Sequence, residues 1–493
     1  MINKSESGFS RYIDLDGMNP VLLGTICGIY PFLFYVSNNF FASNSLEHWG
    51  FFTLVFIGLP ILLFTLLGFI ISRFSRLQAY KKHLLFVSII IITGFFLSYA
   101  SSLLIKKKIL LVVLIVSILL SIKLNDRYKK LLVLIVILSV LPFLKTSYKL
   151  YEHLSHKEWL EQPDDIESVQ FTKTPNVYMI QPDGYVGRSM MEGPLYNYKS
   201  DLYEYLEDEG FKVYDEFRSN YPASLNSNSS LFAMRQHQFG SSLMPDFEMP
   251  YAREVISGNN PVHSIFKKNN YKTFFVAEDE YFQQNKCDQL YDYFNIDIDD
   301  VAYFSKGESV TRKVLPDVKE AFEHRTEKPS FFFIEKCLPH HVHFYAEGDR
   351  VAKERIEYLE KIEEVNIWLK ETIDFITSQD PDGIIIVLAD HGGWVGMNNY
   401  KEMFSTKSPE HINSIYSNLA AIKWNGYNEE EYDEKLTTNV NMFRVLFAAL
   451  SENKSYLNFM EDNSSYNLHL EKSFFNGVSK VMDDSGEVIY EKQ

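Results

Sequence analysis

Five long apolar runs within the first 150 residues are the strongest constraint on how this chain can fold. They occupy residues 20–41, 50–71, 83–105, 109–122 and 131–144. Most come close to the roughly 20 residues that a helix needs to cross a bilayer. None resembles a cleaved signal peptide, because the first run lacks a small-residue cleavage site and further runs follow it. The pattern predicts a transmembrane domain of about five helices over residues 1–150, with four crossings as the alternative because the fourth run is short.

The charge balance changes at the end of this apolar part. Residues 1–150 carry 15 Lys and Arg against 5 Asp and Glu, and the remainder carries 33 against 59. The basic loops at 73–82 and 123–130 are typical of the cytoplasmic side. The lysines at 106–108 would lie on the opposite side in this topology, but we give more weight to the two other loops. Five crossings then place everything after residue 150 on the extracytoplasmic or periplasmic side of the cytoplasmic membrane. The acidic excess there argues against nucleic acid as a partner.

The acidic part alternates strand-like and helix-like segments. Residues 151–174 form a predicted linker, and residues 175–493 a predicted catalytic domain. Short apolar strands are expected at 177–181, 211–214, 271–276, 330–334, 384–389 and 419–423. Helical periodicity separates many of them, and the longest such segment is 351–377. This alternation predicts an α/β fold with a mostly parallel sheet flanked by helices, in which ligands collect at the carboxyl ends of the strands.

Two of these strand ends carry residues that suit a metal. Asp390 and His391 follow the apolar run 384–389, and Gly392 and Gly393 let the backbone turn closely around a ligand. A carboxylate next to an imidazole is a typical pair of metal ligands. The same two residues also occur in loops with a capped turn. Asp183 ends the first strand in a Pro-Asp-Gly sequence, either as a turn residue or as a further carboxylate ligand.

Two more segments complete a candidate site. The Ser/Asn-rich stretch 219–232 contains Ser224 and Ser227. It is either a surface loop with helix-capping serines or a segment that places one serine hydroxyl, as a nucleophile, at a helix N-terminus. A hydroxyl that also binds a metal is deprotonated near neutral pH and attacks phosphorus. Three histidines follow the strand 330–334 and suit a leaving-group acid or phosphate donors, namely His340, His341 and His343.

The predicted metal site is rich in oxygen and has one imidazole. Its four ligands are Asp183, Ser224, Asp390 and His391. Such a tetrahedral set suits one divalent ion, Zn²⁺ or Mn²⁺, ahead of Ca²⁺. Cys287 and Cys337 lie in the exported part, where either a disulfide between them or two buried thiols would be compatible with the sequence.

The order of these motifs resembles the sulfatase-like branch of the alkaline phosphatase superfamily. The likeness is to membrane-anchored lipoteichoic acid synthases and lipid A phosphoethanolamine transferases, and it covers nearly the whole chain. It is carried by the strand 175–184, by the segment 224–232 where the family usually begins with Thr, by 340–343 with Val342 in place of Pro, and by 389–392. A true sulfatase nucleophile is followed by x-Pro-x-Arg, whereas Ser224 is followed by Leu-Asn-Ser-Asn.

The resemblance implies a membrane-anchored phosphotransferase. Ser224 would take a head group, phosphoglycerol or phosphoethanolamine, from a phospholipid donor and pass it to an envelope glycan or lipid through a phospho-serine. His340 would assist the leaving group, and His341, His343 and Ser227 would contact substrate, with Ser227 as the fallback nucleophile. A hydrolase of phosphate or sulfate esters without a glycan acceptor is one alternative, and a catalytically inactive envelope assembly protein is the other.

Overall fold

The computed structural model describes residues 19–155, 157–237, 246–305, 307, 309–340, 350–469 and 477–492. The chain divides into two compact units, Met1–Leu154 and Ser155–Gln493. The first is helical, and the second contains both helices and strands. Each unit is described by itself.

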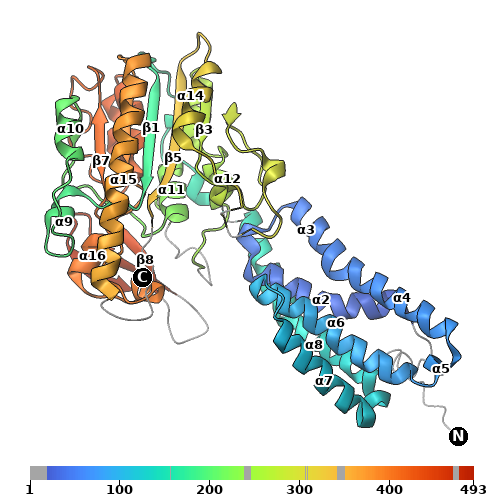
Figure 1. The fold of residues 1–493 in the computed structure, drawn as a ribbon. Coiled ribbons are helices and arrows are strands. Elements are labelled where there is room, and N and C mark those ends of the chain that lie inside the picture. The colour runs from blue at the N-terminus through green and yellow to red at the C-terminus, as the bar shows by residue number, and fades with distance from the viewer. Residues whose placement is uncertain are drawn as a thin grey trace, which may run out of the picture. The chain divides into compact units, whose positions relative to one another are not determined.

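The first unit is built from apolar helices (Figure 1). They are α2 (Pro20–Asn38), α3 (Leu46–Thr53), α4 (Leu59–Arg73), α5 (Ser75–Gln78), α6 (Lys81–Ser102), α7 (Lys107–Leu124) and α8 (Tyr128–Ser155). Four helical stretches are long and apolar enough to cross a membrane, namely Pro20–Asn38, Leu46–Arg73, Lys81–Ser102 and one within Lys107–Leu160. The last of these includes both α7 and α8, which a 3-10 turn at Asn125–Arg127 separates. The number of crossings therefore stays a prediction.

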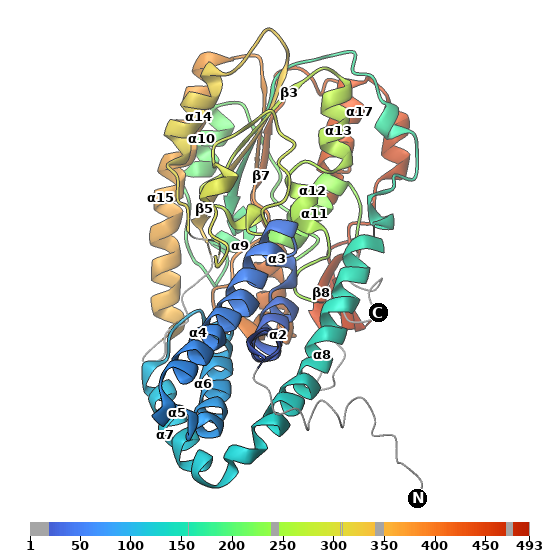
Figure 2. The ribbon, with the colours of Figure 1, turned by 90° about the vertical axis from the view of Figure 1, so that its right-hand side faces the viewer.

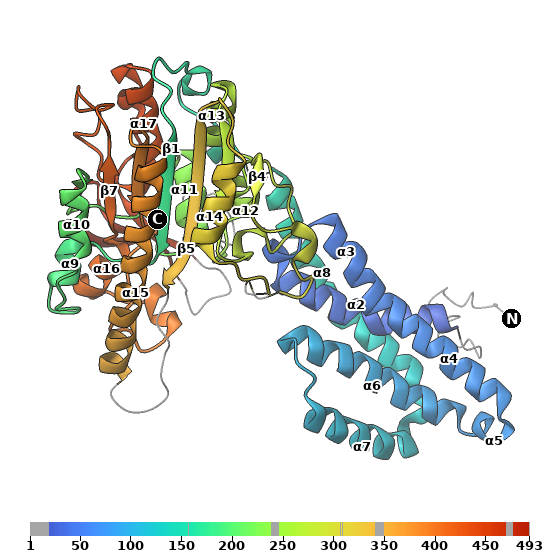
Figure 3. The ribbon, with the colours of Figure 1, turned by 45° about the horizontal axis from the view of Figure 1, so that its top comes forward.

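A seven-stranded sheet forms the centre of the second unit. Its strands are β1 (Val177–Asp183), β2 (Lys212–Val213), β3 (Lys272–Val276), β4 (Tyr293–Phe294), β5 (Ser330–Pro339), β6 (Ile384–Leu388) and β7 (Ala420–Lys423), in the order β2-β7-β6-β1-β5-β3-β4. β1 pairs in parallel with β5 and β6, and β3 pairs in parallel with β4 and β5, whereas β7 is antiparallel to both neighbours. Figure 3 shows β7 and β4 toward opposite sides of β1 and β5. The predicted α/β fold with a mostly parallel sheet is confirmed.

Helices cover both faces of the sheet. Figure 2 shows α10 (Leu202–Asp208), α14 (Val314–Glu323) and α15 (Arg350–Gln379) on one side, and α11 (Ser224–Ala233), α12 (Ala252–Ile256), α13 (Pro261–Lys268) and α17 (Met442–Leu450) on the other. The short helix α9 (Arg188–Glu192) follows β1, and α16 (Pro409–Tyr416) precedes β7. A second sheet of β8 (Ser465–His469), β9 (Gly477–Met482) and β10 (Val488–Lys492) is antiparallel, and no sequence pattern predicted it.

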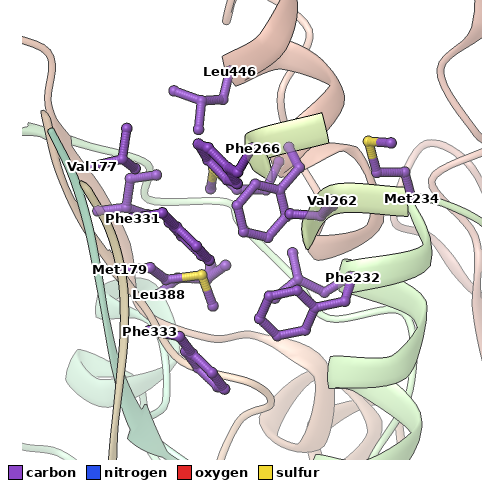
Figure 4. Packing of buried hydrophobic residues seen from close by; sticks show 14 of the residues in the cluster. Val177, Met179, Phe232, Met234, Val262, Phe266, Phe331, Phe333, Leu388 and Leu446 are labelled. Carbon is purple, nitrogen blue, oxygen red and sulfur yellow. The ribbon is translucent and has the colours of Figure 1, made fainter. Parts of the chain in front are cut away.

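The core explains why the central strands are apolar throughout. A strand covered on both faces buries every side chain, and Ile384–Leu388 of β6 is buried along its full length. On the face covered by α11 and α13, Val177 and Met179 of β1 pack with phenylalanines of β5 (Figure 4). The ring of Phe333 lies 5.0 Å from that of Phe232 on α11. The helix that begins at Ser224 is therefore packed firmly against the sheet.

The segment before β1 also belongs to this core. Trp159, Ile166 and Val169 are buried in the same cluster as α11 and α17. Arg444 on α17 forms a buried ion pair with Asp164, with Nη1 to Oδ2 at 2.8 Å. Much of the segment expected to be a linker thus packs on the core of the second unit, while the exact limits predicted for the linker stay a prediction.

Candidate metal and nucleophile site

The candidate site lies where three neighbouring parallel strands end. Asp183 is the last residue of β1, His340 is the first residue after β5, and Asp390 lies two residues after β6. Because β5, β1 and β6 are adjacent and parallel, their carboxyl ends meet at one edge of the sheet. Ser224 begins α11 and reaches the same place, since its Oγ donates to Asp183 Oδ1 at 3.2 Å.

Backbone groups orient the Asp390 carboxylate. Its Oδ1 atom accepts hydrogen bonds from the N–H groups of Gly184 at 3.0 Å and His391 at 2.9 Å. The other oxygen, Oδ2, lies 3.6 Å from His391 Nε2. Burial raises the pKa of Asp390 to about 6, with His391 opposing the shift and the Asp183 carboxylate adding to it. A cation at this position would offset the cost of burying two carboxylates together.

The imidazole of His391 is fixed with Nε2 toward the carboxylates. Its Nδ1 atom donates to the backbone oxygen of Gly392 at 2.7 Å, and its ring stacks on Trp394 with centroids 5.6 Å apart. This places Nε2 3.4 Å from Asp183 Oδ1. A Cβ at Gly392 would lie 2.1 Å from the backbone oxygen of Ser414, so the loop needs glycine there.

The spacing of these groups fits a bound divalent metal. One ligand atom from each of Asp183, Asp390 and His391 lies within 4.8 Å of the other two. Bonds of about 2.0–2.2 Å in a tetrahedral arrangement give ligand separations of roughly 3.3–3.6 Å, which the two measured nitrogen–oxygen distances match. Two carboxylates and an imidazole are donors that suit Zn²⁺ or Mn²⁺. The structure thus brings the predicted ligands together.

Ser224 is placed as a nucleophile would need to be. It is the first residue of α11, where backbone N–H groups and the helix dipole favour negative charge. The other residues of this helix are buried, and Ser224 alone is partly exposed. Its hydroxyl therefore faces the site while the remainder of the helix belongs to the core.

His340 joins the site through Asp183. Its Nδ1 atom donates to Asp183 Oδ2 at 2.8 Å, and its side chain is 44% exposed. Burial by itself lowers the pKa of His340, but the hydrogen bond and charge of Asp183 outweigh it, so the pKa is raised above its usual value. A protonated, accessible imidazole next to the nucleophile suits an acid. His341 and His343, the predicted substrate contacts, lie outside the described residues.

Ser227 points away from solvent. It is 1% exposed, and its hydroxyl donates to the backbone oxygen of Asp390 at 2.6 Å. This hydrogen bond ties α11 to the loop that carries the metal ligands, which favours a supporting role for Ser227. Its predicted contact with substrate stays a prediction. Cys287 and Cys337, whose pairing the sequence left open, are both free thiols.

Buried amides form a second support, and no sequence pattern singles them out. The Asn439 side chain donates to the backbone oxygens of Ala389 at 3.2 Å and Asp390 at 2.9 Å, and it receives a hydrogen bond from Asn418 at 3.0 Å. Tyr358 on α15 donates to the backbone oxygen of Gly184 at 2.8 Å. An isolated asparagine or tyrosine has no spacing signature, so only the folded chain identifies these residues as braces.

The Ser227→Ala variant tests whether Ser227 has a structural role or is itself the nucleophile. We expect it to lose about 1–3 kcal/mol of unfolding free energy, because buried polar groups at Asp390 and Asn439 lose their partner. The variant should still form a covalent phospho-enzyme, because Ser224 is intact. Urea unfolding and intact-protein mass spectrometry measure the two properties. A folded Ser227→Ala protein that forms no adduct, beside a Ser224→Ala protein that does, would make Ser227 the nucleophile.

Comparison with known proteins identifies the family. Residues 191–451 match the sulfatase family, and the chain belongs to it, as its motif order predicted. No curated protein matches the chain. The family and the cluster of Asp183, Asp390 and His391 together support an enzyme with a metal cofactor.

Solved structures similar to this chain share little sequence with it. The integral membrane lipooligosaccharide phosphoethanolamine transferase A of Neisseria meningitidis is 11% identical, with a TM-score of 0.41, over 88% of this chain and 96% of that one. The C-terminal periplasmic domain of phosphoethanolamine transferase EptC from Campylobacter jejuni is 14% identical, with a TM-score of 0.37, over 59% and 93%. The periplasmic domain of EcEptC from Escherichia coli is 12% identical, with a TM-score of 0.38, over 64% and 96%.

Proposed function

We propose that this chain is a membrane-anchored, metal-dependent phosphotransferase that acts outside the cytoplasmic membrane. It moves a phospholipid-derived head group, phosphoglycerol or phosphoethanolamine, to an envelope glycan or lipid. The observation that carries the proposal is the placement of Ser224. This residue begins the buried helix α11, and its hydroxyl donates to Asp183, which forms a cluster with Asp390 and His391 that could hold a metal. A partly exposed hydroxyl at a helix N-terminus, beside acidic ligands, is suited to attack on a phosphate.

In the first half-reaction, Ser224 Oγ forms a bond to the phosphorus of the phospholipid, and the bond from phosphorus to the diacylglycerol oxygen breaks. The hydroxyl proton is lost to solvent before the attack, because positive charge held beside Ser224 and Asp183 would favour the ionised serine. His340 in its protonated form gives a proton to the leaving oxygen, in keeping with its raised pKa and its exposure. The products are diacylglycerol and a phospho-serine at Ser224.

In the second half-reaction, an acceptor hydroxyl attacks the phospho-serine. Neutral His340 takes the acceptor proton, and Ser224 leaves as the ionised oxygen when the phosphorus–Oγ bond breaks. A divalent metal held by Asp183, Ser224, Asp390 and His391 would supply positive charge that favours the ionised serine and the anionic phosphate. Zn²⁺ or Mn²⁺ is the ion that we propose.

Two observations support a lipid donor and a serine nucleophile. The first unit contains four helical stretches suited to crossing a membrane, more than a simple anchor for a soluble substrate requires. Ser224 is followed by Leu225-Asn-Ser-Asn rather than x-Pro-x-Arg, so the oxidised nucleophile of true sulfatases has no counterpart here. Both favour phosphoryl transfer from lipid over hydrolysis of a soluble sulfate ester.

Release of diacylglycerol tests transfer against hydrolysis. The full-length protein in lipid nanodiscs is given phosphatidylglycerol or phosphatidylethanolamine without an acceptor. A transferase should release a burst of about one diacylglycerol per chain and then stall, because the phospho-serine waits for an acceptor hydroxyl. Continuous release of diacylglycerol in water alone would instead favour the hydrolase alternative. No release with either lipid, from protein with bound metal, would reject the phospholipid donor.

A further inference from the structure

Two basic segments of the first unit come together in the folded chain. The segment 73–82 runs from the end of α4 through α5 to the start of α6, and the segment 123–130 runs from the end of α7 to the start of α8. Lys82 Nζ lies 2.5 Å from Asp126 Oδ1, although these residues are 44 positions apart in the sequence. The two segments therefore form one surface, which we call the basic face.

Further contacts fix this arrangement. On α6, Nδ1 of His83 lies 3.3 Å from the Ser121 Oγ atom of α7. Tyr128, the first residue of α8, is buried in a cluster that includes residues of α6. The Gln78 side chain donates to the backbone oxygen of Ser72 at 3.4 Å, which keeps α5 close to the end of α4. The two segments thus hold a defined position relative to each other.

The basic face carries a large excess of positive charge. Eight of its residues are Lys or Arg, and its one acidic residue, Asp126, is already paired with Lys82. Six of the cations have no ion pair with any residue that the structure describes, and all except Lys81 are exposed: Arg73, Arg76, Lys81, Lys123, Arg127 and Lys130. Cations gathered on one surface repel one another, and anions in contact with that surface would offset this repulsion.

The surroundings of the basic face suit a lipid bilayer. Phe74 and Tyr80 are exposed aromatic residues within the segment 73–82, and such residues are typical of the boundary between lipid and water. Directly before this segment, α4 exposes the apolar side chains of Phe69 and Ile70. A phospholipid whose acyl chains pack against the end of α4 would therefore bring its headgroup to the cations.

We propose that the basic face binds the anionic headgroups of phospholipids in the membrane that the first unit crosses, in preference to zwitterionic headgroups. A lipid is favoured over an acidic protein because exposed apolar helix surface adjoins the cations, and one lipid molecule fills both environments. Orientation of the chain during insertion requires positive loops only. The joining of two such loops into one surface goes further, because it concentrates their charge where headgroups lie.

Native mass spectrometry of the full-length protein in detergent measures the binding of added phospholipid. Phosphatidylglycerol and phosphatidylcholine share the glycerol backbone and the phosphate, but the first carries a net negative charge and the second is neutral overall. We expect the wild type to bind phosphatidylglycerol at least about tenfold more tightly than phosphatidylcholine. Higher salt should reduce this preference, because the cations are exposed.

Neutralising cations from both segments should remove the preference. The variant that combines Arg76→Gln, Arg127→Gln and Lys130→Gln should bind phosphatidylglycerol at least about tenfold more weakly than the wild type, with its binding of phosphatidylcholine unchanged. Any phosphatidylglycerol held at Ser224 is common to both proteins, so the difference between them reports on the basic face. If the combined variant does not fold, judged by thermal unfolding, Arg127→Gln alone takes its place.

The matched control removes the same number of cations from the other end of α6. It combines Lys106→Gln, Lys107→Gln and Lys108→Gln, at three exposed lysines that have no ion pair in the described part of the chain. This variant should prefer phosphatidylglycerol as strongly as the wild type does, because its substitutions lie outside the basic face.

The outcomes separate this inference from the proposed function. Equal binding of the two lipids by the wild type would overturn the basic face as a lipid site. A preference that survives in the combined variant, or one that the control loses as strongly, would overturn it as well. Ser224→Ala should keep the preference, since that change lies in the second unit. Failure to release diacylglycerol would count against the proposed function and not against this surface.

Discussion

Replacing Ser224 by alanine is expected to abolish the covalent phospho-enzyme and to lower turnover by a factor on the order of 10⁴–10⁶. The Ser224 hydroxyl at the start of α11 contacts Asp183, one of the residues that could hold a metal. Alanine preserves the helix and removes this oxygen. Intact-protein mass spectrometry after incubation with phosphatidylglycerol or phosphatidylethanolamine and Zn²⁺ or Mn²⁺ measures the adduct. The mass increment on the wild type would also identify the head group.

The Ser224→Thr variant is the matched control, because it keeps a hydroxyl at the same position. It should form the adduct, whereas Ser224→Ala should not, when both proteins are compared after saturation with metal. An adduct of unchanged size on Ser224→Ala would place the nucleophile elsewhere. The absence of any adduct on folded, metal-loaded wild type with either lipid would reject a phospho-serine from these donors.

Removing the metal is expected to stop the reaction and to destabilise the catalytic unit. A ligand that binds only the folded state stabilises it by about 2.7 kcal/mol when present at a hundred times its dissociation constant. Without a cation, the buried carboxylates of Asp183 and Asp390 face each other and repel. A chelator should therefore lower the midpoint of thermal unfolding, and added Zn²⁺ or Mn²⁺ should restore it.

The Asp390→Asn variant shows whether this effect belongs to the site. Asparagine keeps the shape and loses the charge, so the variant should bind metal weakly and show no chelator-dependent change in its unfolding midpoint. Without metal it should be at least as stable as metal-free wild type, because one of two repelling carboxylates is gone. A chelator effect of the same size in Asp390→Asn would mean that the stabilising ion binds elsewhere.

The sequence predicted the central sheet because its strands are apolar on both faces. The predicted strands 384–389 and 330–334 correspond to β6 and β5, which are adjacent to β1 and parallel to it. β4 has two residues, too few to produce a pattern. The sheet of β8, β9 and β10 mixes apolar with polar and charged residues, and it carries no motif, so its existence depends on tertiary packing that the sequence does not display.

The candidate site residues could be predicted where a potential metal ligand directly follows a recognisable strand. Asp183, Asp390 and His391 follow buried strands, and the topology of a parallel sheet then brings them together. Ser224 and Ser227 could not be distinguished from the sequence, because residues three apart on a helix lie on nearly the same face. Only the fold shows that one hydroxyl reaches the site and the other the core.

The hydrogen bond from Ser227 to the Asp390 backbone has a mechanical consequence. It links helix α11, which begins at Ser224, to the loop that contains Asp390 and His391. Asn439 donates hydrogen bonds to both, to the Ser227 hydroxyl and to the backbone oxygen of Asp390. We therefore expect Ser224 and the proposed ligands to keep one arrangement, as a single block, before and after substrate binds. Adaptation to a different donor or acceptor must then come from the segments around this block, whereas the chemistry at its centre stays constant.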